Sequence, residues 1–109
     1  MIDVRVIRDE SGLIHGFIIK GHADFAEEGS DIVCSAVSVL AINTINALEV
    51  FCNAAPEIES ADDAEGGYLR FHIEDPSEEA ELLMRTLELG LVSVSEEYKT
   101  YVNVTDLKD

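Results

Sequence analysis

The order of hydrophobic and polar residues predicts a β-hairpin at the start of the chain. Ile2, Val4 and Val6 alternate with polar residues, which is typical of a strand with one buried face. The turn-forming segment RDESG then leads into the more continuously apolar LIHGFIIK, a second and more deeply buried strand. Residues 2–20 are therefore expected to form a hairpin.

A long apolar helix is predicted to follow a loop over residues 21–30. Ser30 or Asp31 has a side chain suited to N-cap the helix, which we expect to run to about Asn53 because Pro56 cannot continue it. The helix is apolar nearly all round, which indicates a central position in the core. Spaced Ser, Ala, Asn and Thr residues interrupt its apolar run. This favours a buried helix of a soluble protein over a membrane-spanning one.

The second half of the chain again alternates strands and a helix. Residues 57–62 form a weak strand and residues 68–74 a clear one, because Leu, Phe and Ile alternate there with Tyr, Arg and His. Pro76, followed by a run of acids, marks the start of a second helix, and residues 101–105 (YVNVT) form a last strand. The order ββαββαβ predicts a single α+β domain over residues 1–109, with a mixed or antiparallel sheet and two helices on one face.

The chain is strongly acidic, with 23 Asp and Glu against 7 Lys and Arg and a formal net charge of −16. A phosphate backbone would be repelled, so nucleic acid is not expected as a partner. Such charge keeps surfaces solvated, and it would also attract a basic partner; composition does not choose between these two roles. Charged residues near the N-terminus leave no apolar core for an export signal, so we expect a cytoplasmic protein.

The two cysteines, Cys34 and Cys52, are expected to be free thiols. On one helix, at 1.5 Å per residue, they lie about 27 Å apart. A disulfide needs Cα atoms within about 7 Å, so the two cannot pair within the chain. Free thiols suit a reducing compartment. Cys52, near the helix end, is expected only to pack against the core.

Cys34 is the candidate nucleophile. Counted from either N-cap it is the third or fourth helical residue, where free backbone N–H groups and the helix dipole favour a thiolate. His22 in the preceding loop is suited to act as the base that forms the thiolate and then protonates a leaving amine. Packing is the competing interpretation, because free cysteine is among the most buried residue types. The residue pattern alone leaves the two interpretations balanced.

The remaining polar residues have plainer interpretations. Ser38 lies on the same helix face as Cys34, where it can bond the histidine, a substrate or a carbonyl one turn back. Asp31 is a cap that can also orient the site. His15 and His72 lie inside predicted strands and are expected to be structural. No CxxC, HxxxH or HExxH spacing occurs, so neither a metal nor another cofactor is expected.

The segment GHADFAEEGSDIVCSAVS, residues 21–38, resembles the signature of the Prp family, the ribosomal-processing cysteine proteases of bacteria. That signature has Gly-His-Ala after the second strand, a loop ending in Gly-x-Asp, and a cysteine followed by small residues and a serine. The positions that carry the resemblance are Gly21, His22, Ala23, Gly29, Asp31, Cys34 and Ser38. Ser35, where alanine is usual, is a minor variation. Length, element order and acidity extend the resemblance over essentially the whole chain.

The resemblance implies a homodimeric endopeptidase that removes an N-terminal extension from a large-subunit ribosomal protein during ribosome maturation. Cys34 would be its nucleophile and His22 its general base and acid. Cleavage in the family follows a pair of aromatic residues, which implies an apolar groove, and a basic mature protein suits an acidic enzyme. We expect backbone N–H groups at the helix start, including that of Cys34, to bind the oxyanion. Four further residues are expected to support the catalytic pair: Gly21, Gly29, Asp31 and Ser38.

A function of a different class also fits the acidity, namely a non-catalytic factor that binds a basic ribosomal protein during assembly. Only the protease interpretation requires His22 and Cys34 together. A redox role for Cys34 is disfavoured, because no second cysteine lies within reach in the same chain.

Overall fold

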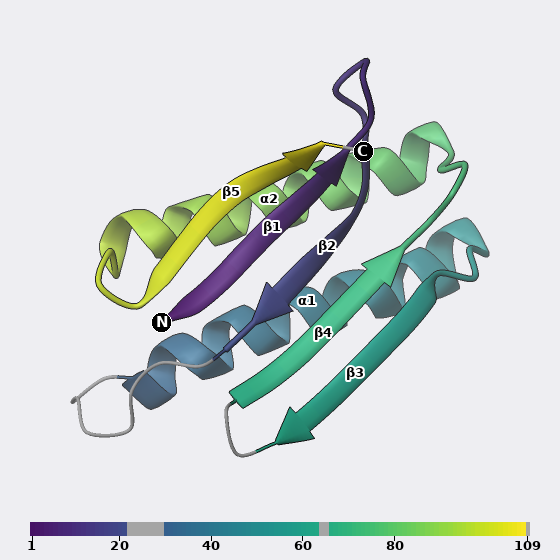
Figure 1. Cartoon of the computed structure of the whole chain (residues 1–109). Coiled ribbons are helices and arrows are strands. Elements are labelled where there is room, and N and C mark those ends of the chain that lie inside the picture. Colours follow the sequence, from purple (N-terminus) through teal and green to yellow (C-terminus); the bar gives the residue numbers. More distant parts are fainter. Residues whose placement is uncertain (22–29, 64–65, 109) are drawn as a thin grey trace.

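A computed structural model describes residues 1–21, 30–63 and 66–108, which form a five-stranded sheet with two helices on one face (Figure 1). The elements in chain order are β1 (Ile2–Arg8), β2 (Ile14–Lys20), α1 (Ser30–Cys52), β3 (Glu57–Asp63), β4 (Gly66–His72), α2 (Glu78–Glu97) and β5 (Val102–Lys108). The predicted order ββαββαβ and the α+β class are confirmed.

The strands are arranged in the order β3-β4-β2-β1-β5. β2 pairs antiparallel with both β1 and β4, β4 pairs antiparallel with β3, and β5 pairs parallel with β1. The sheet is therefore mixed, and α2 provides the crossover that its one parallel pair requires.

The core lies between the sheet and the helices. The strand register places Val6 opposite Phe17 and Phe17 opposite Phe71, so these side chains share the face that the helices cover. The rings of Phe17 and Phe71 stack with centroids 5.5 Å apart, and both are fully buried. From the helices, Val37 and Leu91 pack into the same cluster.

Helix α1 begins differently from the prediction but ends at Cys52, close to the expected end at about Asn53. It already includes Ser30, so neither Ser30 nor Asp31 precedes the helix as an N-cap, and that expectation was wrong. It ends at Cys52, where Asn53 takes the left-handed conformation (φ +52°) that asparagine tolerates. The stop therefore comes from Asn53, three residues before Pro56.

Helix α2 has the N-cap that α1 was expected to have. Ser77 precedes the first helical residue, Glu78, and its hydroxyl accepts a hydrogen bond from the backbone N–H of Ala80 at 3.1 Å. Pro76 lies one residue before the cap, so it marks the start of the helix as predicted.

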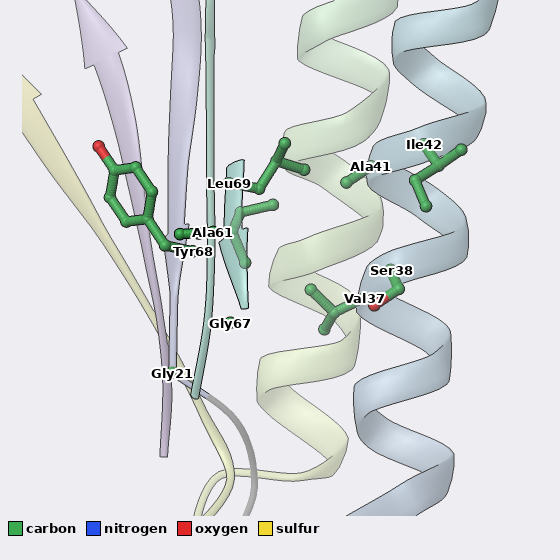
Figure 2. Close-up of a pocket in the computed structure, with 10 residues that line it drawn as sticks. Gly21, Val37, Ser38, Ala41, Ile42, Ala61, Gly67, Tyr68 and Leu69 are labelled. Atoms are coloured by element: carbon green, nitrogen blue, oxygen red, sulfur yellow. The ribbon is translucent and has the colours of Figure 1, made fainter. Parts of the chain in front are cut away.

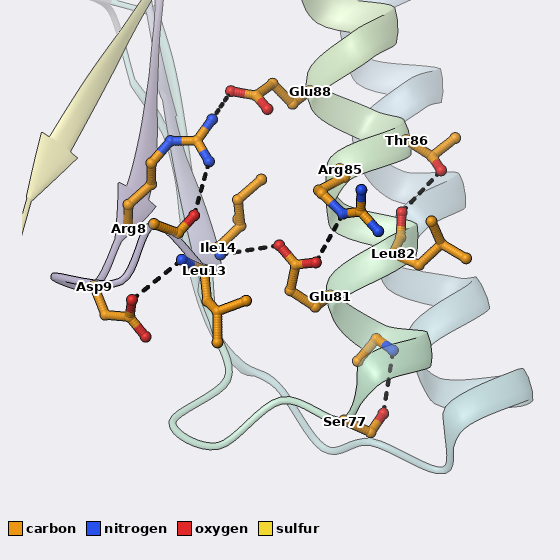
Figure 3. Close-up of polar contacts among 12 residues, drawn as sticks. Arg8, Asp9, Leu13, Ile14, Ser77, Glu81, Leu82, Arg85, Thr86 and Glu88 are labelled. Carbon is orange, nitrogen blue, oxygen red and sulfur yellow. Dashed lines mark hydrogen bonds and ion pairs between the residues drawn. The ribbon is translucent and has the colours of Figure 1, made fainter.

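Polar side chains fix α2 to the hairpin (Figure 3). The buried carboxylate of Glu81 accepts hydrogen bonds from the backbone N–H of Ile14 at 3.2 Å and from Nε of Arg85 at 2.8 Å. Arg8 at the end of β1 forms an ion pair with Glu88, about two turns after Glu81 along α2. Because Glu81 and Ile14 are buried, loss of this hydrogen bond would leave the N–H of Ile14 without an acceptor and would lower the stability of the fold.

Helix α1 is only half buried, which corrects the prediction of a central helix. Its inner side, including Val33 and Leu48, packs in the core, whereas Val39 and Val50 are among several large apolar side chains exposed on the other side. The segment Ile32–Cys52 is long and apolar enough to cross a membrane by length and composition, a test that core helices also pass. The outer side of α1 is therefore a helix surface with several exposed large apolar side chains.

Candidate active site

Cys34 is the fifth residue of α1 and is partly buried against the core. The residues directly before Ser30 lie outside the described part of the chain, so the expected oxyanion donor at Cys34 stays a prediction. The thiol lies in the N-terminal part of α1, close to the positive end of the helix dipole.

The structure describes only some of the other predicted site residues. Gly21 and Ser38 are described in full, and Asp31 is the second residue of α1. His22 and Gly29 lie outside the described residues. The expected pairing of His22 with Cys34 thus stays a prediction.

Gly21 occupies a position that only glycine fits. Its φ of +89° is in the left-handed region, and a Cβ on it would lie 2.5 Å from the carbonyl oxygen of Met1. Its N–H donates to the carbonyl oxygen of Gly67 at 2.8 Å. Gly21 is thereby fixed between β1 and β4, directly before His22 in the chain.

A groove of about 380 Å³ runs between α1 and the strands (Figure 2). Its lining comprises Ile19, Gly21, Val37, Ser38, Ala41, Ile42, Ala61, Gly67, Tyr68 and Leu69. Ser38 is one turn beyond Cys34, and Gly21 immediately precedes His22. The groove therefore brings together the two chain segments that carry the predicted catalytic residues.

The groove is suited to apolar side chains of an extended ligand. Aliphatic side chains form most of its wall, and glycine and alanine leave the space open, while the hydroxyls of Ser38 and Tyr68 offer polar contacts. The contributions of β3 and β4, including Tyr68 and Leu69, were not predicted. The adjacent glycines at 66–67 were the available signal, because glycine in a strand often marks a close approach of a ligand or another backbone.

His15 has a structural role, as predicted. It lies near the start of β2, with Nε2 2.8 Å from the carboxylate of Asp9 and Nδ1 3.0 Å from the carbonyl oxygen of Ile73, and the protonated ring donates to both. The hydrogen bond to Asp9 is the main cause that raises the pKa of His15 above its ordinary value. The ring also stacks on His72, with centroids 5.9 Å apart. Within residues 1–21, 30–63 and 66–108 no three His, Cys, Asp or Glu side chains gather as a metal site.

Cys34 and Cys52 are both in the thiol state and partly buried, which agrees with the prediction that they do not form a disulfide with each other. Cys52 packs against the core at the opposite end of α1 from the groove's Ser38. Cys52 lies on the same helix as Cys34 and is likewise reduced and partly buried, but it is at the end of α1 away from Ser38. It is therefore a suitable internal control.

Comparison with known proteins gives a consistent match over nearly the whole chain. The family model described as "Cysteine protease Prp" matches residues 1–103. The curated ribosomal processing cysteine proteases Prp of Staphylococcus aureus and Bacillus subtilis are each 32% identical, covering 95% and 96% of this chain and 97% and 96% of their own lengths. Among solved structures, SMU.848 from Streptococcus mutans is 30% identical with a TM-score of 0.89, covering 100% of this chain and 96% of its own. The Prp of S. aureus in complex with a substrate peptide is 26% identical with a TM-score of 0.80, covering 98% and 100%.

Proposed function

This chain belongs to the cysteine protease Prp family, and on that premise we propose that it cleaves an N-terminal extension from a large-subunit ribosomal protein. The name shared by the S. aureus and B. subtilis relatives supports the processing role, and the S. aureus structure with a substrate peptide supports peptide binding by this fold. The single observation that carries the proposal is the groove lined by Gly21 and Ser38, because it offers a peptide a binding surface one helical turn from Cys34.

Cys34 is the proposed nucleophile and His22 the proposed general base and acid. His22 accepts the thiol proton, and the Sγ of Cys34 attacks the carbonyl carbon of the scissile peptide bond. The tetrahedral intermediate collapses as His22 returns the proton to the leaving amine, which leaves an acyl group on the sulfur. Water then attacks the thioester, releases the acid product and restores the thiol. The free N–H groups in the first turn of α1 are the proposed oxyanion donors.

The groove is the proposed site for the apolar residues that precede the cut. Val37 and Ala41 of α1 face Leu69 of β4 across it (Figure 2). Burial of one large apolar side chain contributes roughly 1.5–3 kcal/mol to binding. The groove therefore gives a physical basis for cleavage after bulky apolar residues.

The charge and the cysteines support further parts of the proposal. A formal net charge of −16 would speed encounter with a basic ribosomal protein. Reduced cysteines at positions 34 and 52 suit a cytoplasmic enzyme. A homodimer is proposed as the working form, and the exposed apolar side of α1 is the surface that supports it. No cofactor and no nucleic acid are required by the proposed mechanism.

A peptide that spans the junction between extension and mature protein tests the proposal. The wild-type chain should cleave it at one bond, Cys34→Ser should not, and Cys52→Ser should cleave it at the wild-type rate. His22→Ala should lose cleavage as well. If the wild type leaves the peptide intact but binds it, the acidic non-catalytic factor becomes the better account. Equal losses in Cys34→Ser and Cys52→Ser would instead indicate a folding defect.

A further inference from the structure

Three of the seven basic side chains gather on the face of the sheet that the helices leave uncovered (Figure 1). Arg5 lies on β1, Lys20 on β2 and Arg70 on β4. Arg5 and Arg70 are both register partners of Ile18, one on each side of it, and Lys20 is two residues further along β2. Lys20 is thus the diagonal neighbour of both arginines, with Cβ atoms about 7–8 Å apart. We call Arg5, Lys20 and Arg70 the cationic cluster.

No carboxylate in the described part of the chain forms an ion pair with the cationic cluster. In the strand register Asp3 stands opposite Lys20, and Glu59 stands opposite Arg70. Neither acid is within ion-pair distance of its cross-strand partner. The carboxylate of Asp3 instead accepts a hydrogen bond from Nδ2 of Asn103 on the other side, at 3.5 Å. The positive charge of the cluster is therefore left for another group.

This lack of pairing contrasts with the composition of the chain, in which acids outnumber bases 23 to 7. The other two arginines, Arg8 and Arg85, show the ordinary outcome, because each pairs with a carboxylate. Like charges that stand close together on a sheet destabilise it. A bound anion would supply the compensation that the chain itself does not give the cationic cluster.

A pocket of about 410 Å³ opens on the same face of the sheet, and we call it the open-face pocket. Its volume is in the range of small-ligand sites, about 300–1,000 Å³. Among its lining residues Arg5 and Lys20 are basic and Asp3 is acidic, so two positive charges and one negative charge leave +1. Ile18 and Tyr68 add apolar and aromatic surface. The pocket therefore offers positive charge beside apolar surface.

A carboxylate joined to an apolar group is the ligand that fits this lining. A guanidinium can bind a carboxylate through two parallel N–H groups, and an ammonium adds a further charge-assisted hydrogen bond. Aromatic and aliphatic side chains bind the apolar part of a ligand. The C-terminal end of a peptide combines both chemistries, in its carboxylate and its last side chain. A polyanion fits less well, because the chain has a formal net charge of −16.

The open-face pocket also borders the peptide groove, because Gly21 and Tyr68 line both. We propose that the open-face pocket binds the C-terminal end of a peptide. Arg5 and Lys20 hold its carboxylate, and Ile18 contacts its last side chain. In the proposed reaction the released extension is such a peptide, since cleavage gives it a new carboxylate after apolar residues. That source of the ligand rests on the proposed protease function, whereas the pocket does not.

Titration of the isotope-labelled full-length chain with N-acetylphenylalanine tests the proposal. This probe carries one carboxylate and one aromatic side chain. We expect saturable shifts of the backbone N–H signals of Arg5 and Lys20 in the magnetic resonance spectrum. N-acetylphenylalaninamide should bind roughly tenfold or more weakly, because it loses the charge-assisted hydrogen bonds. Acetate and inorganic phosphate should also bind more weakly than the probe, because they lack the apolar part.

Lys20→Met and Lys99→Met form a matched pair of variants. Both positions are exposed and the change in charge is the same, but Lys99 lines neither the open-face pocket nor the peptide groove. Lys20→Met should bind N-acetylphenylalanine roughly tenfold more weakly, and Lys99→Met should bind it like the wild type. Without the probe, Lys20→Met should melt no lower than the wild type, because it removes one of three neighbouring like charges.

Gly67→Leu separates the two sites, because its added side chain enters the peptide groove and Gly67 does not line the open-face pocket. It should bind the probe like the wild type. Binding that is lost in Gly67→Leu but kept in Lys20→Met would place the probe in the groove and overturn the proposal.

Three further results would also overturn it. They are equal binding of the acid and the amide, equal weakening in Lys20→Met and Lys99→Met, and the absence of any saturable shift at Arg5 and Lys20. Acetate or phosphate that binds as tightly as the probe would overturn the assignment to a peptide end. If the probe binds in the open-face pocket but the chain cleaves no peptide, the proposed function fails and the pocket stands.

Discussion

Filling the groove from β4 should block cleavage without unfolding the chain. A Cβ added at Gly67 meets no atom within 4 Å, so the side chain of Gly67→Leu has open space to enter. Glycine is also a weak strand residue, so the replacement should not lower the free energy of unfolding. Thr105→Leu is the control, because it adds the same side chain at an exposed position of β5, outside the groove.

The size of the effect follows from the substrate side chain that loses its place. A large apolar side chain contributes about 1.5–3 kcal/mol when it is fully buried. Loss of that contribution lowers kcat/KM about 10- to 150-fold. The assay is cleavage of the junction peptide, with thermal melting of both variants in parallel. If Gly67→Leu melts like the wild type and also cleaves at the wild-type rate, the groove does not bind the residues that precede the cut.

Two predictions concern stability. Glu81→Ala should lower the free energy of unfolding by about 1–3 kcal/mol, because the buried N–H of Ile14 loses its acceptor. Chemical denaturation measures this change. The control variant Glu96→Ala, at an exposed position, should show a much smaller one. The pKa of His15 is raised in the folded chain, so its contact with Asp9 stabilises fully below about pH 6.5 and is lost as the pH rises through the higher folded pKa. The stability difference between the wild type and Asp9→Asn should therefore shrink with rising pH, and a constant difference would contradict this.

The order of elements could be predicted because each element has a clear period. The alternation at Val4 and Val6 and the Leu spacing around Leu87 and Leu91 correspond to buried faces in the structure. The helix starts were less accurate, since Ser30, expected as a cap, lies within α1, and Ser77, which caps α2, was not singled out from the sequence.

The site could be predicted only along the chain, not across the sheet. The resemblance over residues 21–38 identified Gly21 and Ser38, which line one groove, and Cys34, one helical turn before Ser38. Tyr68 and Leu69 join that surface because β4 pairs with β2, and strand order is not encoded in any local period. The exposure of one side of α1 was also not predicted. An apolar sequence pattern does not show whether the rest of the same chain or a second subunit covers a helix face.

Intact-mass spectrometry of the acid-quenched reaction tests the central claim most directly. After brief mixing with the junction peptide, the wild-type chain should gain the mass of the N-terminal product minus water, and digestion should place that mass on Cys34. Hydroxylamine, which cleaves thioesters, should remove it. Cys52→Ser should show the same adduct and Cys34→Ser none. Cleavage without any adduct in the wild type, or an unchanged cleavage rate in Cys34→Ser, would contradict the assignment of Cys34 as the nucleophile.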